Sequence, residues 1–130
     1  MNAVNTQAHK SSHTGSCHCG AVKFEVRSAL LPATRCNCSL CKRKGALMSP
    51  VFAVDDLHIV EGAEALAMYQ FNTRSAQHFF CKICGIYPFH QTRKDARLWR
   101  VNLGCLDGVD AYTLESVIAD GASLSVVEEA

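Results

Sequence analysis

Seven of the eight cysteines in this 130-residue chain fall into three short clusters. The clusters are a first pair, a triplet and a last pair: Cys17 and Cys19, then Cys36, Cys38 and Cys41, then Cys81 and Cys84. Such spacing lets two thiolates of one tight turn reach a single metal ion, and a following glycine suits the turn because it adopts positive φ without steric cost. Gly20 and Gly85 follow the first and last pairs. The clustering therefore predicts metal binding, and an all-thiolate tetrahedral site favours zinc, with iron as the alternative.

The clustered cysteines divide naturally into a set of four and a set of three. Four ligands make a closed structural zinc site, whereas a catalytic site keeps three protein ligands and one open position. In one division the first pair joins the last pair in the closed site, and the triplet binds a second zinc with an open position. In the other, Cys38 and Cys41 join the last pair, which leaves Cys36 with the first pair. Spacing alone leaves both divisions open.

An open, cysteine-bound zinc predicts chemistry on a thiol substrate. A free thiol has a pKa of about 8.5 and is largely protonated at neutral pH, whereas a coordinating thiol is deprotonated. A thiol at the open position would therefore be a positioned thiolate beside an electrophilic carbonyl carbon. If both metals are structural instead, the chain would be a zinc-stabilised binding module.

Four other features of the sequence could contribute to the sites or could be purely structural. Cys105 has no partner nearby in the sequence and is expected to be a small buried hydrophobe. His18 lies between two candidate ligands and is interpreted as a spacer. His90 could reach the site as a proton relay, although a hydrogen-bonded structural histidine is the commoner case. The Lys42–Lys44 run could attract the carboxylates of a thiol substrate, or form a solvated charged face.

The composition is typical of one soluble cytoplasmic domain. A content of 48% hydrophobic residues supplies a modest core, and a net charge of +1 gives no argument for nucleic acid as a partner. No run approaches the about 18 apolar residues that would span a membrane. Residues 1–14 lack the apolar segment of a secretory signal and are expected to form a disordered polar tail. In the reducing cytoplasm that this predicts, the cysteines are not expected to form disulfides.

Short strands and turns must position these clusters. Apolar and charged residues alternate over Ala21–Arg27, which is the period of a half-buried strand. One helical turn is expected over Ser39–Lys44, capped by Ser39 and ended by Gly45. Further short extended segments are expected at 30–35, 47–54, 57–60, 65–71, 77–81, 86–91 and 98–103, with loops and one short helix or strand after 107. The sequence thus predicts a single, mostly β domain over residues 15–130.

Four segments of the sequence together resemble one known family. They are Gly15–Val22, Cys36–Gly45, Phe80–Ile86 and Val101–Asp110. The set is similar to the glutathione-dependent formaldehyde-activating enzyme family, which includes centromere protein V. The resemblance implies a mainly β fold, the β-tent, in which small antiparallel sheets surround zinc-binding cysteine turns.

The resemblance also implies roles for the cysteines. It favours the first division, with Cys17, Cys19, Cys81 and Cys84 at a structural zinc and Cys36, Cys38 and Cys41 at a catalytic zinc. The chemistry proposed for the family joins glutathione and formaldehyde into S-hydroxymethylglutathione, and such proteins are usually described as carbon–sulfur lyases. We therefore expect two zinc ions per chain, the second more easily lost, with glutathione and a small aldehyde as partners. The rival hypothesis is a non-catalytic, zinc-stabilised protein-binding module of the same fold.

Overall fold

Three small sheets make up the described part of the molecule, which is residues 10–71 and 73–119 of a computed structural model. The three-stranded sheet has the order β1 (Ser11–Ser16), β2 (Lys23–Ser28), β5 (Leu57–Glu61). The two-stranded sheet pairs β10 (Ser116–Ala119) with β3 (Ala33–Cys36). The five-stranded sheet has the order β4 (Phe52–Ala53), β9 (Leu98–Val101), β8 (Phe89–Gln91), β7 (Gln77–Cys81), β6 (Leu66–Tyr69).

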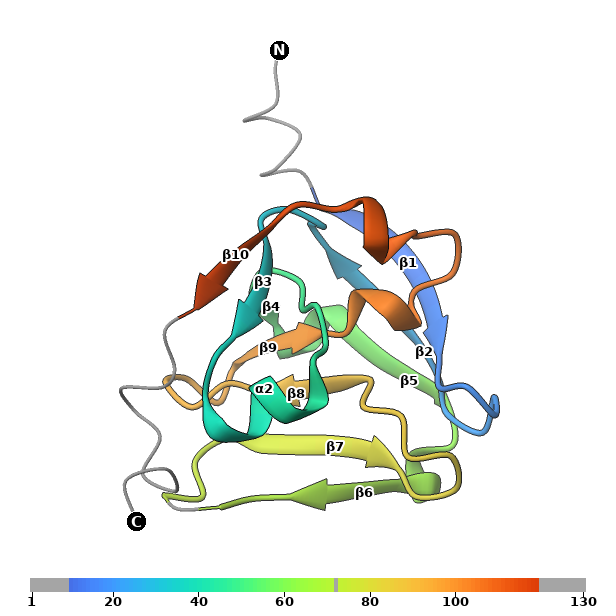
Figure 1. The fold of residues 1–130 in the computed structure, drawn as a ribbon. Helices are drawn as coiled ribbons and strands as arrows, with labels where there is room; N and C mark the ends of the chain where they lie inside the picture. The colour runs from blue at the N-terminus through green and yellow to red at the C-terminus, as the bar shows by residue number, and fades with distance from the viewer. Residues whose placement is uncertain (1–9, 72, 120–130) are drawn as a thin grey trace.

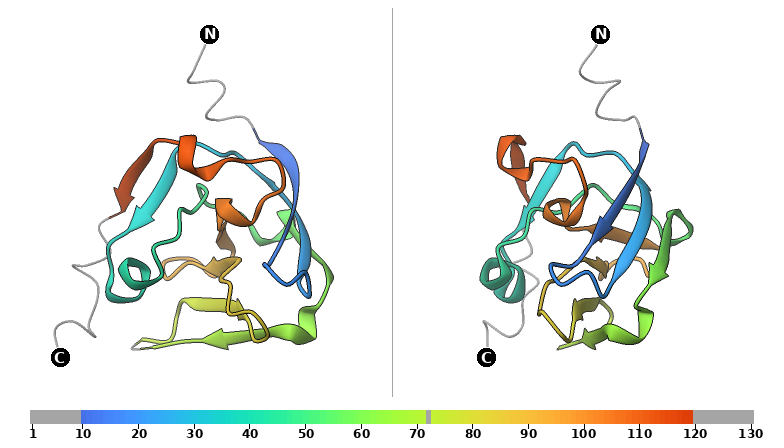
Figure 2. Two further views of the ribbon diagram at one scale, coloured as in Figure 1. Left: turned by 45° about the vertical axis from the view of Figure 1, so that its right-hand side comes forward. Right: turned by 90° about the vertical axis from the view of Figure 1, so that its right-hand side faces the viewer.

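Helical structure among these residues is limited to single turns. The α-helix α2 spans Ser39–Lys44, and the 3-10 turns are η1 (Val54–Asp56), η2 (Ala63–Ala65), η3 (Leu103–Cys105) and η4 (Ala111–Thr113). Figure 1 shows β6 and β7 along the base, with β1 and β2 on one side and β3 and β10 on the other. The two turned views of Figure 2 show the same arrangement, with the sheets inclined to one another. The prediction of a mainly β fold with small antiparallel sheets is confirmed.

The core lies between the three-stranded and five-stranded sheets. Phe24 and Val26 of β2 are buried while their neighbours along the strand are exposed, which confirms the alternation expected for Ala21–Arg27. The ring of Phe24 meets that of Phe89 edge to face, with centroids 5.4 Å apart. Aromatic pairs in this geometry stabilise more than their buried area alone would. This contact joins the three-stranded sheet, in which the first cysteine pair lies between β1 and β2, to the five-stranded sheet, whose strand β7 ends at Cys81.

The prediction of a disordered polar tail over residues 1–14 is wrong for residues 11–14, which belong to a strand. Residues 1–9 lie outside the described residues, but Ser11–Ser16 forms β1, which pairs antiparallel with β2 from Ser11↔Ser28 to Ser16↔Lys23. Backbone hydrogen bonds to β2 order a segment too polar to bury itself. Gly15 also packs closely, since a Cβ there would lie 2.6 Å from the ring of Phe24.

The C-terminal part of the fold differs from the expected antiparallel pattern at one strand. β10 pairs in parallel with β3, and Ala119 lies opposite Cys36. The backbone amide of Asn37 also donates to the carbonyl of Ala119 at 3.2 Å. The strand that carries Cys36 is therefore held by a segment more than 80 positions away in the sequence. Residues 120–130 of the predicted domain lie outside the described residues. Among the described residues, no helix is long and apolar enough to cross a membrane.

Candidate functional site

The first and last cysteine pairs form a cluster of four sulfurs. The Sγ atoms of Cys17, Cys19, Cys81 and Cys84 all lie within 4.8 Å of one another. Cys17 Sγ is 3.6 Å from Cys19 Sγ, and Cys19 Sγ is 3.7 Å from Cys81 Sγ. Zinc–sulfur bonds of about 2.3 Å at tetrahedral angles separate two sulfurs by about 3.8 Å. This four-sulfur cluster therefore fits a closed tetrahedral metal ion.

The two turns that build the four-sulfur cluster have matching backbone geometry. In the first turn Cys17 N–H donates to the carbonyl of Val22 at 3.1 Å, and Gly20 N–H donates to the carbonyl of Cys17 at 3.3 Å. In the second, Gly85 N–H donates to the carbonyl of Cys81 at 2.7 Å. Gly20 and Gly85 have φ of 82° and 81°, a region that other residues adopt only with strain. The glycines therefore allow each turn to present its sulfurs to one point.

The thiols of the four-sulfur cluster differ in acidity, because the pKa values of Cys17 and Cys84 are lowered while the pKa of Cys19 is raised to about 11. Val22 N–H donates to Cys17 Sγ at 3.3 Å. The pKa of the Cys84 thiol is lowered to about 6, because the backbone amides of Cys19 and Ile86 donate hydrogen bonds to its sulfur. Metal ligands must be deprotonated, so the lowered pKa values of Cys17 and Cys84 favour cation binding at neutral pH, whereas the thiol of Cys19 must release its proton when a cation binds.

The triplet forms a second cluster of three sulfurs. The Sγ atoms of Cys36, Cys38 and Cys41 lie within 4.8 Å of one another. Cys36 ends β3, Cys38 precedes α2 and Cys41 lies within α2. The pKa of Cys38 is far below its ordinary value, because the Cys36 and Cys41 thiols donate hydrogen bonds to its sulfur. The three-sulfur cluster therefore carries negative charge and could hold a metal ion with one position left for another ligand.

The helix that carries Cys41 is capped differently from the prediction. The N-cap is Cys38, whose Sγ accepts the amide N–H of Cys41 at 3.3 Å, and the expected cap, Ser39, is the first helical residue. Since the chain turns at Cys38 to bring its sulfur toward Cys36, the residue before the helix supplies the cap. Gly45 ends the helix with φ of 66°, as expected. One sulfur thus serves both the local helix and the cluster.

The Lys42–Lys44 run has two environments. Lys42 and Arg43 are exposed, and Arg43 Nη1 donates to the carbonyl of Ser39 at 2.7 Å. Lys44 turns toward the cluster, where its Nζ lies 3.4 Å from Cys41 Sγ and 4.0 Å from the centre of the Tyr87 ring. Lys44 therefore offsets negative charge at the three-sulfur cluster, while the first two bases belong to the charged face that the sequence also allowed.

A cavity of about 330 Å³ opens beside the three-sulfur cluster. All three cysteines of that cluster line it, and none of the four-sulfur cluster does. Its wall includes apolar side chains such as Met48 and Phe71, and three bases, Arg93, Lys94 and Arg100. No Asp or Glu is among the described residues that line it. The two clusters therefore differ in their relation to the cavity: the three-sulfur cluster lines it, and its basic, partly apolar wall suits a small anion.

One face of the five-stranded sheet supplies a row of polar residues to this cavity. His78 of β7 pairs with His90 of β8, and His90 pairs with Arg100 of β9. All three line the cavity. Because successive side chains of a strand point to opposite faces, their neighbours Phe79, Phe89 and Val101 pack toward the core. We call His78, His90 and Arg100 the polar row.

The two ends of the polar row are fixed by hydrogen bonds. His78 Nδ1 and the Tyr87 hydroxyl lie 2.5 Å apart, and Arg100 Nη1 donates to the carbonyl of Ser49 at 3.0 Å. Burial lowers the pKa of His78 to about 4 and also lowers the pKa of Arg100. The histidine is therefore neutral at neutral pH, and Arg100 holds a positive charge that burial makes more costly.

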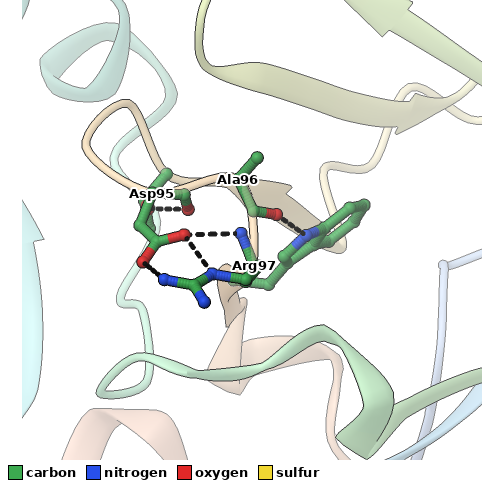
Figure 3. Close-up of polar contacts among 5 residues, drawn as sticks. Asp95, Ala96 and Arg97 are labelled. Atoms are coloured by element: carbon green, nitrogen blue, oxygen red, sulfur yellow. Dashed lines mark hydrogen bonds and ion pairs between the residues drawn. The ribbon is translucent and has the colours of Figure 1, made fainter.

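The turn between β8 and β9 carries Arg93 and Lys94, which line the cavity. Figure 3 shows how Asp95 fixes this turn: its carboxylate accepts from Arg97 Nε at 3.1 Å, from Arg97 Nη2 at 3.0 Å and from the Arg97 amide at 2.9 Å. These contacts hold the pKa of Asp95 below its ordinary value. Trp99 Nε1 donates to the carbonyl of Ala96 at 3.1 Å. The turn is thus held in one shape by its own residues.

The remaining predicted residues fall outside both clusters. His18 is exposed, as expected for a spacer. Cys105 is buried in the core, and burial raises its pKa to about 12, in keeping with the small hydrophobe expected. The sulfurs group as the first division has them and not as the second, in which Cys38 and Cys41 would lie with Cys81 and Cys84. The structural and catalytic roles of the two clusters stay a prediction.

Sequence reasoning missed His78 and Arg100 as cavity residues. The alternation of Leu98–Leu103 puts Arg100 on the face opposite Trp99 and Val101, which was a usable signal. Nothing in the sequence shows which cluster that face meets.

The model of the family described as "Glutathione-dependent formaldehyde-activating enzyme" matches residues 12–118 of this chain. The chain belongs to this family. The suspected resemblance is therefore confirmed, and the match includes every cysteine of both clusters.

Two individual proteins are also similar to this chain. A protein of Halomonas elongata, provisionally named as a glutathione-dependent formaldehyde-activating enzyme, is 37% identical over 78 residues. The aligned region is 54% of this chain and only half, 50%, of that relative's length. A crystal structure of a Rhodobacter sphaeroides protein is 45% identical with a TM-score of 0.76, and the match covers 81% of this chain and 97% of that one.

Proposed function

We propose that this chain is a cytoplasmic, zinc-dependent enzyme of the carbon–sulfur lyase type that joins a thiol, with glutathione as the leading candidate, to a small aldehyde such as formaldehyde. The observation that carries the proposal is that the cysteines of the three-sulfur cluster line a basic cavity, whereas none of the four-sulfur cluster lines it. The family name and the provisional name of the Halomonas relative support the choice of thiol and aldehyde.

Zinc is the proposed metal for both clusters because each donor set consists of thiolates alone. The four-sulfur cluster is assigned to a structural ion and the three-sulfur cluster to a catalytic one. When bound at the three-sulfur cluster, zinc would lower the pKa of an incoming thiol and keep it as a thiolate.

The chain itself prepares the cavity for this reaction. Lys44 Nζ, at 3.4 Å from Cys41 Sγ, offsets the charge that builds up when thiolates gather at one point. Met48 and Phe71 contribute apolar surface to the wall, and a less polar surrounding strengthens electrostatic contacts. The amide of Cys41 holds Cys38 Sγ in place.

The basic residues of the cavity would bind the carboxylates of the thiol. Arg100 is planar, permanently charged and able to form two parallel hydrogen bonds with one carboxylate. Arg93 and Lys94 lie on the β8–β9 turn at the same cavity. Two groups of bases on separate elements suit a substrate such as glutathione, whose two carboxylates lie at its two ends.

The test begins with metal content per chain on freshly purified protein, before and after a mild chelator, followed by titration with glutathione. We expect close to two zinc ions, one resistant to the chelator and one easily removed and perturbed by glutathione. Exchange NMR should then show faster interconversion of glutathione, formaldehyde and their adduct than in buffer. Zinc that resists the chelator and ignores thiols, with no gain in exchange rate, would favour the binding module instead.

The β8–β9 turn gives a separate prediction on binding. Asp95→Ala removes three hydrogen bonds that hold the turn, so Arg93 and Lys94 should spend less time at the cavity. We expect glutathione to bind several-fold more weakly by calorimetry, with zinc content unchanged. Glu25→Ala, a change on the exposed side of β2, is the matched control and should bind glutathione as the unchanged protein does. Equal affinities for all three proteins would show that the turn takes no part in binding.

A further inference from the structure

His90 has a buried polar atom that the described residues leave unsatisfied. The side chain is 8% exposed, and its Nδ1 has no hydrogen-bond partner. Buried polar groups are almost always hydrogen-bonded, so an exception requires an explanation, such as a ligand that completes it. His90 lines the same cavity as Cys36, Cys38 and Cys41, and this is where such a ligand would lie.

The neighbours of His90 hold its ring but do not bond to Nδ1. Its ring centroid lies 5.5 Å from that of His78 and 5.8 Å from that of Tyr87, both in tilted contact. His78 and Tyr87 are already hydrogen-bonded to each other, and Arg100 on the other side donates to the carbonyl of Ser49. In the polar row, the central member therefore holds a fixed imidazole whose Nδ1 is buried and makes no hydrogen bond, so a small molecule in the cavity reaches it as the surrounding side chains shift.

The charge state of His90 narrows its chemistry. Burial lowers its pKa well below the ordinary value, and the nearby charges of Lys44 and Arg100 act in the same direction while that of Cys38 opposes them. The ring is therefore neutral at neutral pH, with one nitrogen protonated and the other an acceptor. A neutral imidazole donates a hydrogen bond to an oxygen without giving up its proton, which suits a carbonyl oxygen that gains negative charge during a reaction.

We propose that Nδ1–H of His90 donates a hydrogen bond to the carbonyl oxygen of the aldehyde while the thiol sulfur, held at the three-sulfur cluster, attacks the carbonyl carbon. This proposal rests on the proposed function and makes His90 a catalytic residue of it. In the step, the carbon–sulfur bond forms and the carbon–oxygen π bond breaks, with its electron pair moving onto the oxygen. The oxygen then takes a proton from water, which balances the proton that the thiol released to water, and nothing is oxidised or reduced.

The test compares two substitutions that differ in hydrogen bonding. His90→Leu removes the donor, whereas His90→Asn keeps an amide N–H near the position of Nδ1. We expect His90→Leu to lower the enzymatic exchange rate of the glutathione–formaldehyde adduct by about 10²–10³-fold, the usual effect of deleting one oxyanion donor. His90→Asn should stay within about tenfold of the unchanged protein on the same scale. His58→Leu, a change at an exposed histidine of β5, is the control and should exchange at the unchanged rate.

Two further readouts separate this role from a structural one. Because Nδ1 makes no hydrogen bond within the described protein, His90→Leu should keep its zinc content, its glutathione affinity and its Tm. In the unchanged protein, the 15N resonance of His90 Nδ1 should shift when formaldehyde is added to the glutathione-loaded form. Wild-type exchange in His90→Leu, equal losses in the Leu and Asn variants, or an unmoved resonance would each overturn the inference. An unchanged protein that never accelerates exchange would overturn the proposed function itself, and this inference with it.

Discussion

Cys84→Ser is expected to prevent stable folding of the chain. The substitution removes one of the four sulfurs that join the first cysteine turn to the last. Structural zinc sites contribute about 10–16 kcal/mol in small zinc peptides, which is comparable to the whole stability of a domain at about 5–15 kcal/mol. Loss of about 5 kcal/mol would lower Tm by roughly 20 °C in a chain of this size. The measurement is thermal unfolding by circular dichroism, together with zinc content.

The control for this prediction is a buried cysteine outside both clusters. Cys105→Ala removes a thiol from the core near Phe24 and Leu106, where burial is the main cause of its raised pKa. We expect a cost of about 1 kcal/mol, typical of a small core deletion, and an unchanged zinc content. A Cys84→Ser protein as stable and as rich in zinc as this control would show that the four-sulfur cluster holds no structural metal.

Cys38→Ser is expected to abolish turnover while the fold survives. The serine hydroxyl can still accept the amide N–H of Cys41, so α2 keeps its N-cap. The three-sulfur cluster, however, loses the sulfur that most favours the thiolate. We expect one zinc per chain instead of two and a fall in adduct exchange of at least about 10²-fold, the scale on which loss of an electrostatic group acts.

The measurements for Cys38→Ser are zinc content, Tm and exchange NMR on the same preparation. A Tm within a few degrees of the unchanged protein would show that only the site is lost. Full activity in a folded Cys38→Ser protein would rule out the three-sulfur cluster as the place of reaction. Together the two variants distinguish the clusters: loss of a sulfur from the four-sulfur cluster is expected to lower stability, and loss of one from the three-sulfur cluster is expected to lower activity.

Local features of the fold were predictable because they depend on neighbours in the sequence. The alternation in Ala21–Arg27, the helical turn at Ser39–Lys44 and the strand at Gln77–Cys81 each follow from a period, a cap signal or a turn signal. The error on the helix cap also has a local cause. Ser39 has the commoner capping side chain, but the cluster turns the chain at Cys38, so the sulfur takes that position.

The long-range features could not be predicted from spacing. Both divisions of the cysteines satisfied the same local rules, and only the distances between sulfurs distinguish them. β1 is polar enough to suggest a tail, and its order comes from β2. The polar row depends on the register between β7, β8 and β9, which brings His78, His90 and Arg100 into line although no motif connects them.

The four-sulfur cluster also constrains the order of events during synthesis. Cys19 and Cys81, whose sulfurs are 3.7 Å apart in the folded chain, are separated by 62 positions in the sequence. At about 5–20 residues per second, a ribosome needs roughly 3–12 s to add that stretch. During this interval Cys17 and Cys19 are made but half of their cluster is not. The nascent chain therefore passes through a period in which its first thiols are exposed to oxidation and to competing metals. The domain can complete its fold only after the last cysteine turn has been synthesised.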